Sequence, residues 1–159
     1  MTLIRKPEAP WVFRATGAFV ENARELAQEQ GSRLAVYEID GANTGDFGGL
    51  FAEFAAVLQF PDYFGSNLAA FEDCLGDLDW IEPVELLIVI SNSNELLASQ
   101  TEEDLEAVIE VFQDVAEGWA EPVDEGEEWD RDAVPFHVAL VGCDPPVREV
   151  IAELELIDW

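Results

Sequence analysis

The side chains best placed for chemistry are carboxylates between residues 67 and 80. Apolar side chains in this segment recur at spacings of three and four residues, which predicts a helix with one buried face: Leu68, Phe71 and Leu75. Asp73 then lies on the opposite, exposed face, and Asp77 follows one turn later on that face. Carboxylates in such a row bind guanidinium and ammonium groups. The segment is therefore a candidate site for a basic partner, and Trp80, just after it, is a candidate aromatic anchor.

Acidic side chains also support catalysis, and two enzymatic alternatives follow from them. One is a hydrolase with paired carboxylates, and the other is a Mg²⁺ site built from Asp73, Asp77 and Asp114. The sequence has no glycine-rich phosphate loop and no nucleophile elbow. His137 is the one histidine and lies in an apolar run, so we expect a core residue and no histidine triad. We therefore expect a protein that is not an enzyme and that holds no metal or cofactor.

The charge of the chain indicates which partners it attracts. Asp and Glu number 35 against 7 Lys and Arg, for a formal net charge of −28. Residues 34–130 contain 25 carboxylates and no Lys, Arg or His. Such a surface repels nucleic acid and anionic membranes and attracts basic proteins. Adaptation to a high-salt host would produce the same composition, so the charge alone does not identify a partner.

Composition also bears on the compartment. No apolar run approaches the roughly 20 residues that cross a bilayer, and no apolar signal segment follows Arg5 and Lys6. Cys74 and Cys143 are too few for a disulfide framework, so we expect two buried thiols, with one disulfide between them as the alternative. These features predict a cytoplasmic protein.

The hydrophobic pattern predicts alternating strands and helices. Strands are expected at residues 11–15, 33–39, 84–90 and 136–141, and helices at 19–30, 47–58, 68–75, 102–118 and 147–154. The expected helix N-caps are Asp46, Asn67 and Thr101, the last within Thr-Glu-Glu-Asp, a variant of the capping box. This order predicts one α/β domain with a small parallel sheet of three core strands, to which Trp11 to Ala15 adds a candidate fourth.

One segment carries a more specific signal than periodicity. Residues 60–75 read Phe-Pro-Asp-Tyr-Phe-Gly-Ser-Asn-Leu-Ala-Ala-Phe-Glu-Asp-Cys-Leu. This resembles the signature of the barstar family, in which an apolar residue and Pro precede an aromatic pair, Gly-x-Asn-Leu and a helix with an outward Asp. Gly65 is expected to adopt the positive φ angle that turns the chain into the helix. The resemblance, which covers residues 33–141, implies one barstar-like domain over residues 1–159, with 1–32 as an N-terminal extension and 120–133 as an acidic loop.

The resemblance also implies a function. Barstar-like proteins plug a ribonuclease active site with this helix and its preceding loop, in an immunity or antitoxin role. We therefore expect a one-to-one inhibitor of a basic ribonuclease. Asp73 falls on the family's central contact and Asp114 on an acidic contact. Tyr63 falls on an aromatic contact and Trp80 approximately on another. The implied partner-binding residues are Tyr63, Glu72, Asp73, Asp77, Trp80 and Asp114.

The match departs from the family where the partner would bind. Ala69 stands where the family has Asp, and Glu72 stands where it has a contacting Trp. Two extra residues, within Asp77 to Asp79, precede Trp80. These departures indicate either a changed partner or lost inhibition. A second binding hypothesis is a DNA mimic that sequesters a basic DNA-binding protein, using the acidic run from Glu72 to Glu128.

Overall fold

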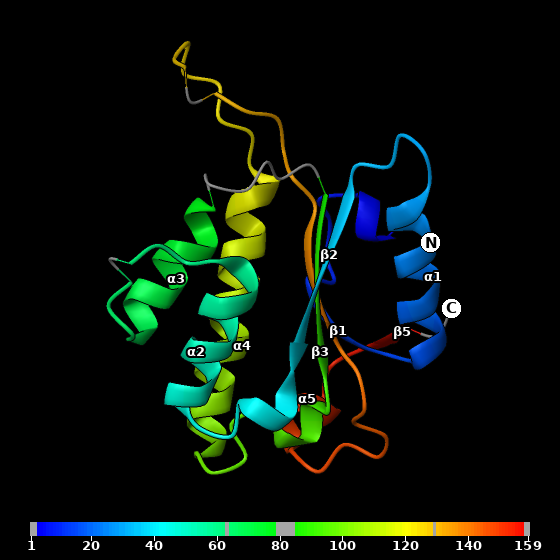
Figure 1. The fold of residues 1–159 in the computed structure, drawn as a ribbon, viewed down its shortest axis with the longest axis vertical. Helices are drawn as coiled ribbons and strands as arrows, with labels where there is room; N and C mark the ends of the chain where they lie inside the picture. The colour runs from blue at the N-terminus through cyan, green and yellow to red at the C-terminus, as the bar shows by residue number, and fades with distance from the viewer. Residues whose placement is uncertain (1–2, 63, 79–84, 129, 158–159) are drawn as a thin grey trace.

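Five parallel strands form the frame of the molecule. The computed structural model describes residues 3–62, 64–78, 85–128 and 130–157. The strands lie in the order β2-β3-β4-β1-β5, and every neighbouring pair is parallel (Figure 1). Their bounds are β1 (Val12–Ala15), β2 (Leu34–Asp40), β3 (Glu85–Ser91), β4 (Phe136–Leu140) and β5 (Leu156–Ile157).

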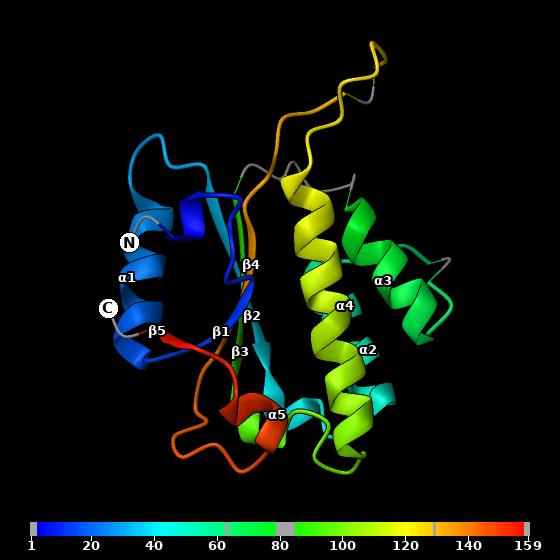
Figure 2. The same cartoon turned by 180° about the vertical axis from the view of Figure 1, so that it is seen from behind.

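Helices cover both faces of this sheet. One layer consists of α2 (Phe47–Leu58), α3 (Leu68–Asp77) and α4 (Glu102–Ala120). On the opposite face lie α1 (Gly17–Gln28) and the 3₁₀ turn η1 (Leu3–Arg5) (Figures 1 and 2). The shorter elements are η2 (Gly41–Asn43), η3 (Ser93–Glu95) and α5 (Glu149–Ala152). In the part of the chain described, no helix has the length and apolarity needed to cross a membrane.

The nearly continuous apolar run of β3 explains the two helical layers. Successive side chains of a strand point to opposite faces of the sheet, so this run presents apolar groups on both sides. Leu86, Ile88 and Ile90 belong to the core beneath α2, α3 and α4. Leu87 and Val89 belong to a second core with Phe13, Phe19 and Ala23. The predicted α/β class with a parallel sheet is therefore confirmed.

The sheet has one strand more than expected. The candidate strand at Trp11 to Ala15 is present as β1, between β4 and β5. The additional strand is β5, which pairs with β1 through Arg14–Leu156 and Ala15–Ile157. A two-residue strand carries no hydrophobic pattern of its own. The helix expected at residues 147–154 is correspondingly short, because the chain leaves α5 to form β5.

Helix starts agree with the expected N-caps, but the turn before α3 differs. The caps are Asp46, which accepts from Gly49 N at 2.7 Å, Asn67, which accepts from Ala70 N at 2.9 Å, and Thr101, which accepts from Asp104 N at 3.1 Å. The prediction that Gly65 has a positive φ angle is wrong. The next residue, Ser66, has the positive φ angle instead, at 51°. Gly65 avoids a side-chain contact: a Cβ there would lie 3.1 Å from the Asn67 amide nitrogen.

The segments outside the core resemblance have defined places. Residues 3–32 supply β1 and α1, and α1 provides much of the second core. The segment after α4 projects beyond the end of the helical layer (Figures 1 and 2). An antiparallel bridge between Val123 and Arg131 closes its base. Asp130 accepts hydrogen bonds from the backbone nitrogens of Glu125 and Gly126.

His137 is fully buried on β4, as expected for a core residue. Its Nε2 lies 3.0 Å from the carbonyl oxygen of Glu8, while Nδ1 has no hydrogen-bond partner among the described residues. The rings of Trp11 and Phe13 lie at centroid distances of 5.9 and 6.2 Å. Burial lowers the pKa of His137 from its ordinary value, because an apolar environment disfavours the imidazolium.

The substitution His137→Leu should therefore remove a pH-dependent part of the stability. The folded-state pKa lies below the unfolded value of about 6.5, so the unfolded chain binds the proton more readily. The contribution of His137 is complete above about pH 6.5 and is lost as the pH falls below it. From about pH 7 to 5.5, the unfolding free energy of the wild type should fall relative to the variant by up to about 1.4 kcal/mol per pH unit. Urea denaturation at constant salt measures the unfolding free energy of both proteins at each pH. Parallel pH profiles for the wild type and the variant would contradict the prediction.

Candidate functional site

Helix α3 presents carboxylates because its apolar side chains hold the opposite face in the core. Phe71 and Leu75 are fully buried, and Asn67 caps the first turn. Asp73 and Asp77 are exposed, as the spacing predicts. Glu72, one position before Asp73, is half-buried. The helix thus has one packed face and one acidic face.

The first hollow lies between α3 and the loop that precedes it. It has a volume of about 260 Å³ and is lined by Phe64, Gly65, Ala70, Asp73, Cys74 and Asp77. Two of the predicted residues, Asp73 and Asp77, therefore share a site with the loop of the signature. Burial, followed by the negative charges of Asp77 and Asp73, raises the pKa of the Cys74 thiol. Cys74 and Cys143 are both buried and free, as expected.

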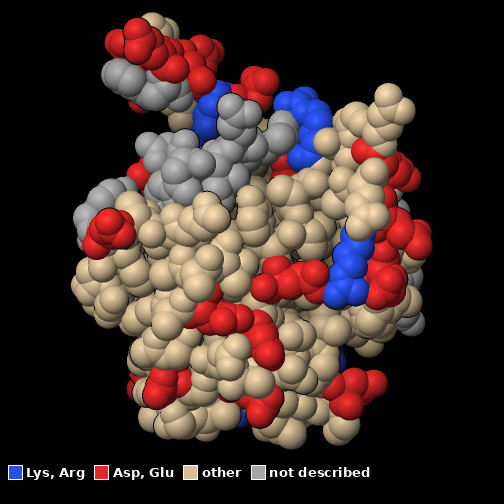
Figure 3. Space-filling view, in the orientation of Figure 1, with Lys and Arg blue, Asp and Glu red and all other residues tan. Residues whose placement is uncertain are grey.

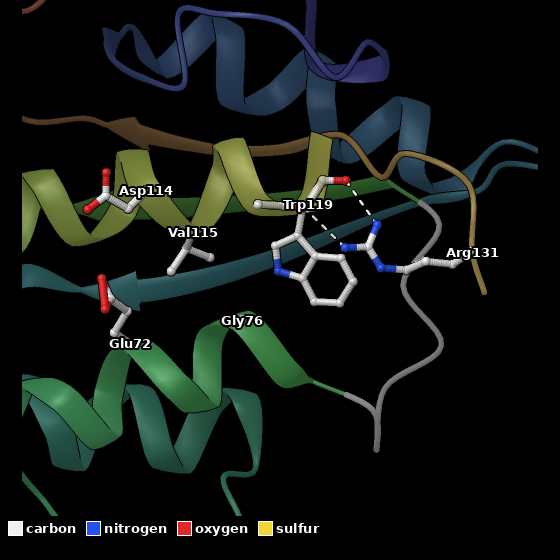
Figure 4. A pocket seen from close by; sticks show the side chains of 7 residues that line it. Glu72, Gly76, Asp114, Val115, Trp119 and Arg131 are labelled. Carbon is white, nitrogen blue, oxygen red and sulfur yellow. Dashed lines mark hydrogen bonds between the residues drawn. The ribbon is translucent and has the colours of Figure 1, made fainter. Parts of the chain in front are cut away.

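The second hollow lies between α3 and α4 and has a volume of about 450 Å³ (Figure 4). Glu72 and Asp114 lie at one end on facing helices, and Trp119 and Arg131 lie at the other. Gly76, Gly118 and Val115 complete its lining. This groove combines two carboxylates, an apolar floor and one internal cation.

The structure divides the predicted site residues into two groups. Asp73 and Asp77 line the first hollow, and Glu72 and Asp114 line the second. Tyr63 and Trp80 lie outside the described residues. The candidate Mg²⁺ site of Asp73, Asp77 and Asp114 is not assembled, since Asp114 lines a different hollow. In the described ranges, no group of three or more His, Cys, Asp or Glu side chains is arranged to hold a metal ion.

Two glycines line the groove, one on each helix. Gly76 lies one turn after Glu72 on α3, and Gly118 lies one turn after Asp114 on α4. A Cβ at either position would meet no atom within 4 Å outside its own helix backbone and chain neighbours, among the residues described. Packing therefore does not require glycine, although glycine within a helix destabilises it by about 0.5–1 kcal/mol relative to alanine.

Arg131 is a groove residue that sequence reasoning missed. Its guanidinium carbon lies 4.6 Å from the centre of the Trp119 ring. The group also donates hydrogen bonds to the carbonyl oxygens of Gly118, Trp119 and Glu121 at 3.1–3.2 Å. These carbonyls end α4, where the helix dipole favours a cation. Partial burial lowers the pKa of Arg131, which nonetheless stays charged at neutral pH. One feature of the sequence could have indicated this role. Arg131 is a single basic residue next to many carboxylates, which favours contacts within the protein.

Trp119 is a core residue that joins α4 to α3. Its side chain is 4% exposed, and its Nε1 donates to the Leu75 carbonyl oxygen at 2.9 Å. Arg131 covers the ring from the side of the acidic loop. The two side chains therefore brace the end of the groove that lies farther from Glu72 and Asp114.

Three carboxylates of the two hollows, Glu72, Asp73 and Asp114, stand apart from the ion pairs of the described residues. Ion pairs join Arg5 to Glu85, Arg24 to Glu21 and Glu38, and Arg148 to Glu102. None of these pairs includes Glu72, Asp73 or Asp114. Neither α2 nor α3 contains Lys or Arg. Figure 3 shows carboxylates gathered at the tip of the acidic loop, while the α3 side of the molecule shows few carboxylates and no Lys or Arg in this view.

The fold and these helices define an α/β protein that exposes the carboxylates of α3 to solvent. The family described as barstar (barnase inhibitor) matches residues 34–141. The chain therefore belongs to the barstar family, and the resemblance drawn from residues 60–75 is confirmed. No curated protein matches the chain at a significant level.

A solved structure with a similar fold belongs to a different protein. The Aeropyrum pernix ORC2 protein, determined as ADPNP-ADP complexes, aligns with a TM-score of 0.60 and 12% sequence identity. The alignment covers 99% of this chain and 43% of that chain. At this identity the likeness concerns the fold alone, and the chain spans less than half the length of that protein.

The substitution Arg131→Met should destabilise the protein by about 1–3 kcal/mol, because the carbonyl groups at the end of α4 lose a charged donor. Arg24→Met is the matched control, since it removes an exposed cation that pairs with Glu21 and Glu38 and should have a much smaller effect. Urea denaturation at neutral pH measures both. Equal losses of unfolding free energy in the two variants would show that the effect depends on the number of charges and not on the position of Arg131.

Proposed function

We propose that the protein inhibits a basic ribonuclease by covering its active site, and that it acts by binding and not by catalysis. The observation that carries the proposal is the exposed Asp73. It stands on α3 beside the signature loop, outside every described ion pair, in a member of the barstar family. A ribonuclease active site must be cationic to hold an RNA phosphate, and a carboxylate on a rigid helix can occupy that position.

The remaining residues of the proposed interface have different roles. Asp77, in the same hollow, and Asp114, across the groove, would face cations around the active site. Glu72 replaces the aromatic contact of the family and extends the acidic surface into the groove. Tyr63 and Trp80, which the family resemblance assigns to aromatic contacts, complete the proposal as anchors. Ala69 removes one carboxylate, so the ribonuclease is expected to differ from barnase in the matching cation.

The proposal includes a one-to-one complex and an immunity role. Such a role places the inhibitor in the cytoplasm of the cell that makes the ribonuclease, and two free thiols fit a reducing compartment. The acidic surface would capture the enzyme quickly, because a net charge of −28 attracts a basic protein over distances beyond contact.

The substitution Asp73→Arg should abolish inhibition, whereas Glu25→Arg should preserve it. Both change the net charge equally, but Glu25 is exposed on α1, on the opposite side of the sheet. A central carboxylate facing a desolvated cation should contribute at least about 2 kcal/mol, or about 30-fold in affinity. The assay is RNA hydrolysis by a panel of purified barnase-type ribonucleases, titrated with each inhibitor.

The outcomes separate a specific site from generic charge. A one-to-one endpoint with the wild type and Glu25→Arg, but not with Asp73→Arg, supports the proposal. Equal inhibition by both variants would assign the effect to net charge. Failure to inhibit any ribonuclease, together with capture of a DNA-binding protein that duplex DNA displaces, would support the DNA-mimic alternative.

The association rate with an inhibited ribonuclease should fall by about tenfold or more between 50 mM and 500 mM NaCl, because salt screens the attraction between distant charges. The dissociation rate should change much less, since it depends on contacts already formed. Stopped-flow mixing measures both rates. An association rate that does not vary with salt would show that the acidic surface does not guide the encounter.

A further inference from the structure

Strand β2 forms one edge of the sheet, and its outer side is open. It pairs with β3 on one side, and no strand of the described structure pairs with the other. In Figure 1 the strand lies in front of the sheet, and no helix or loop of the described chain crosses it. The opposite edge is β5, a strand of two residues, whereas β2 has seven. The sheet therefore has one long free edge.

The backbone groups on this edge can be assigned by alternation. Along a strand in a parallel pair, every second residue bonds to the neighbouring strand and the residues between them point away from it. Arg33 and Ile39 direct their carbonyl oxygens toward β3, where they accept from Glu85 N at 3.1 Å and Ser91 Oγ at 3.3 Å. The N–H and C=O groups of the even-numbered residues from 34 to 40 therefore point outward.

Both ends of this edge are capped, which leaves a window at its centre. The first and last of the outward amides donate to Ser32 Oγ at 3.3 Å and to Glu53 Oε2 at 2.9 Å. Between them, the outward backbone groups of Val36 and Glu38 make no hydrogen bond to any described residue. Unpaired backbone groups in such a row can pair with an added strand.

The two faces beside the window differ in chemistry. Side chains alternate between the faces of a sheet, so Tyr37 lies on one face and Val36 and Glu38 lie on the other. Tyr37 is half-buried against the larger core, and Val36 packs against the second core. Glu38 is exposed beside α1, where Arg24 pairs with it and with Glu21. An added strand would meet an aromatic ring on one face and carboxylates on the other.

Charge indicates which kind of strand fits. Sheet edges are commonly protected from pairing by Lys or Pro, and β2 contains neither. Its charged residues, Glu38 and Asp40, are acidic, as is Glu53 at its end. A second copy of the chain would bring the same carboxylates and a net charge of −28 to this edge. Charge complementarity therefore favours a basic segment of another protein.

We propose that β2 is a docking site at which an extended basic segment of another protein adds as a further strand of the sheet. The outward groups of Val36 and Glu38 would supply the hydrogen bonds. The added side chains would alternate, with Lys or Arg toward Glu38 and apolar groups toward Tyr37. This edge shares no residue with the two hollows of α3, so the inference does not depend on the proposed function.

The first test uses the capped peptide Lys-Val-Lys-Val-Lys-Val-Lys, titrated into the full chain at low salt. Binding should slow hydrogen exchange of the Val36 and Glu38 amides by at least about tenfold, because both become hydrogen-bonded. NMR measures the exchange. The control peptide has Glu in place of Lys and should not bind. The proposal is overturned if the Lys peptide fails to bind, binds without protecting these amides, or binds no better than the Glu peptide.

Backbone methylation of the Lys peptide tests strand pairing at constant composition and charge. Alternate N–H groups of a strand point to opposite sides. Methyl groups on the backbone nitrogens of all lysines, or of all valines, therefore block opposite edges of the peptide. One methylated peptide should bind at least about tenfold more weakly than the other. Equal affinities for the two would show that the peptide does not bind as a strand.

Glu38→Pro tests the edge from the side of the protein. It removes an outward N–H and keeps the bonds to β3, since an edge strand tolerates proline where the N–H faces solvent. Glu38→Gln is the matched control, because it removes the same charge and keeps the N–H. The Lys peptide should bind Glu38→Pro at least about tenfold more weakly than Glu38→Gln.

Two results with these variants would overturn the site on β2. One is equal affinity of Glu38→Pro and Glu38→Gln for the Lys peptide. The other is binding that Asp73→Arg abolishes and Glu38→Pro leaves unchanged, which would place the peptide on α3. If Glu38→Pro does not fold, the two methylated peptides decide the question with the wild-type chain.

Discussion

The burial of β3 on both faces is the constraint on which the rest of the structure depends. Its side chains alternate between two cores, so the sheet is stable only if helices cover each side. Residues 3–32 provide one cover through α1, and α2, α3 and α4 provide the other. Because α3 packs its apolar face against α2 and α4, its opposite face is held toward solvent. The acidic surface is thus positioned through α2 and α4, whose apolar side chains share a core with the central strand.

The position of α3 also explains why the acidic surface has two parts. The helix stands between the loop that precedes it and α4, and each neighbour leaves a hollow. Consecutive side chains of a helix point about 100° apart, so Glu72 and Asp73 enter different hollows. One hollow combines carboxylates with the signature loop. The other combines carboxylates with a cation and two glycines.

The few cations of the chain serve the fold more than the surface. Arg14, Arg131 and Arg148 donate to backbone carbonyl oxygens at the ends of strands, helices and turns. Other cations pair with carboxylates at a distance from α3, as in Arg5 with Glu85. A net charge of −28 opposes the compact state through self-repulsion, so the stability of the molecule relies on its two apolar cores.

The sequence by itself determined the α/β class, the N-caps at Asp46, Asn67 and Thr101, and the exposed side of α3, because periodicity and capping depend on neighbours along the chain. It also carried the family signature in residues 60–75. The tertiary structure alone decided that β5 completes the sheet, that Ser66 and not Gly65 takes the positive φ angle, and that Asp114 joins Glu72 and not Asp73. Arg131 and the paired glycines likewise acquire a common site only when α3 packs beside α4. These features depend on contacts between residues distant in the sequence, and no local pattern records them.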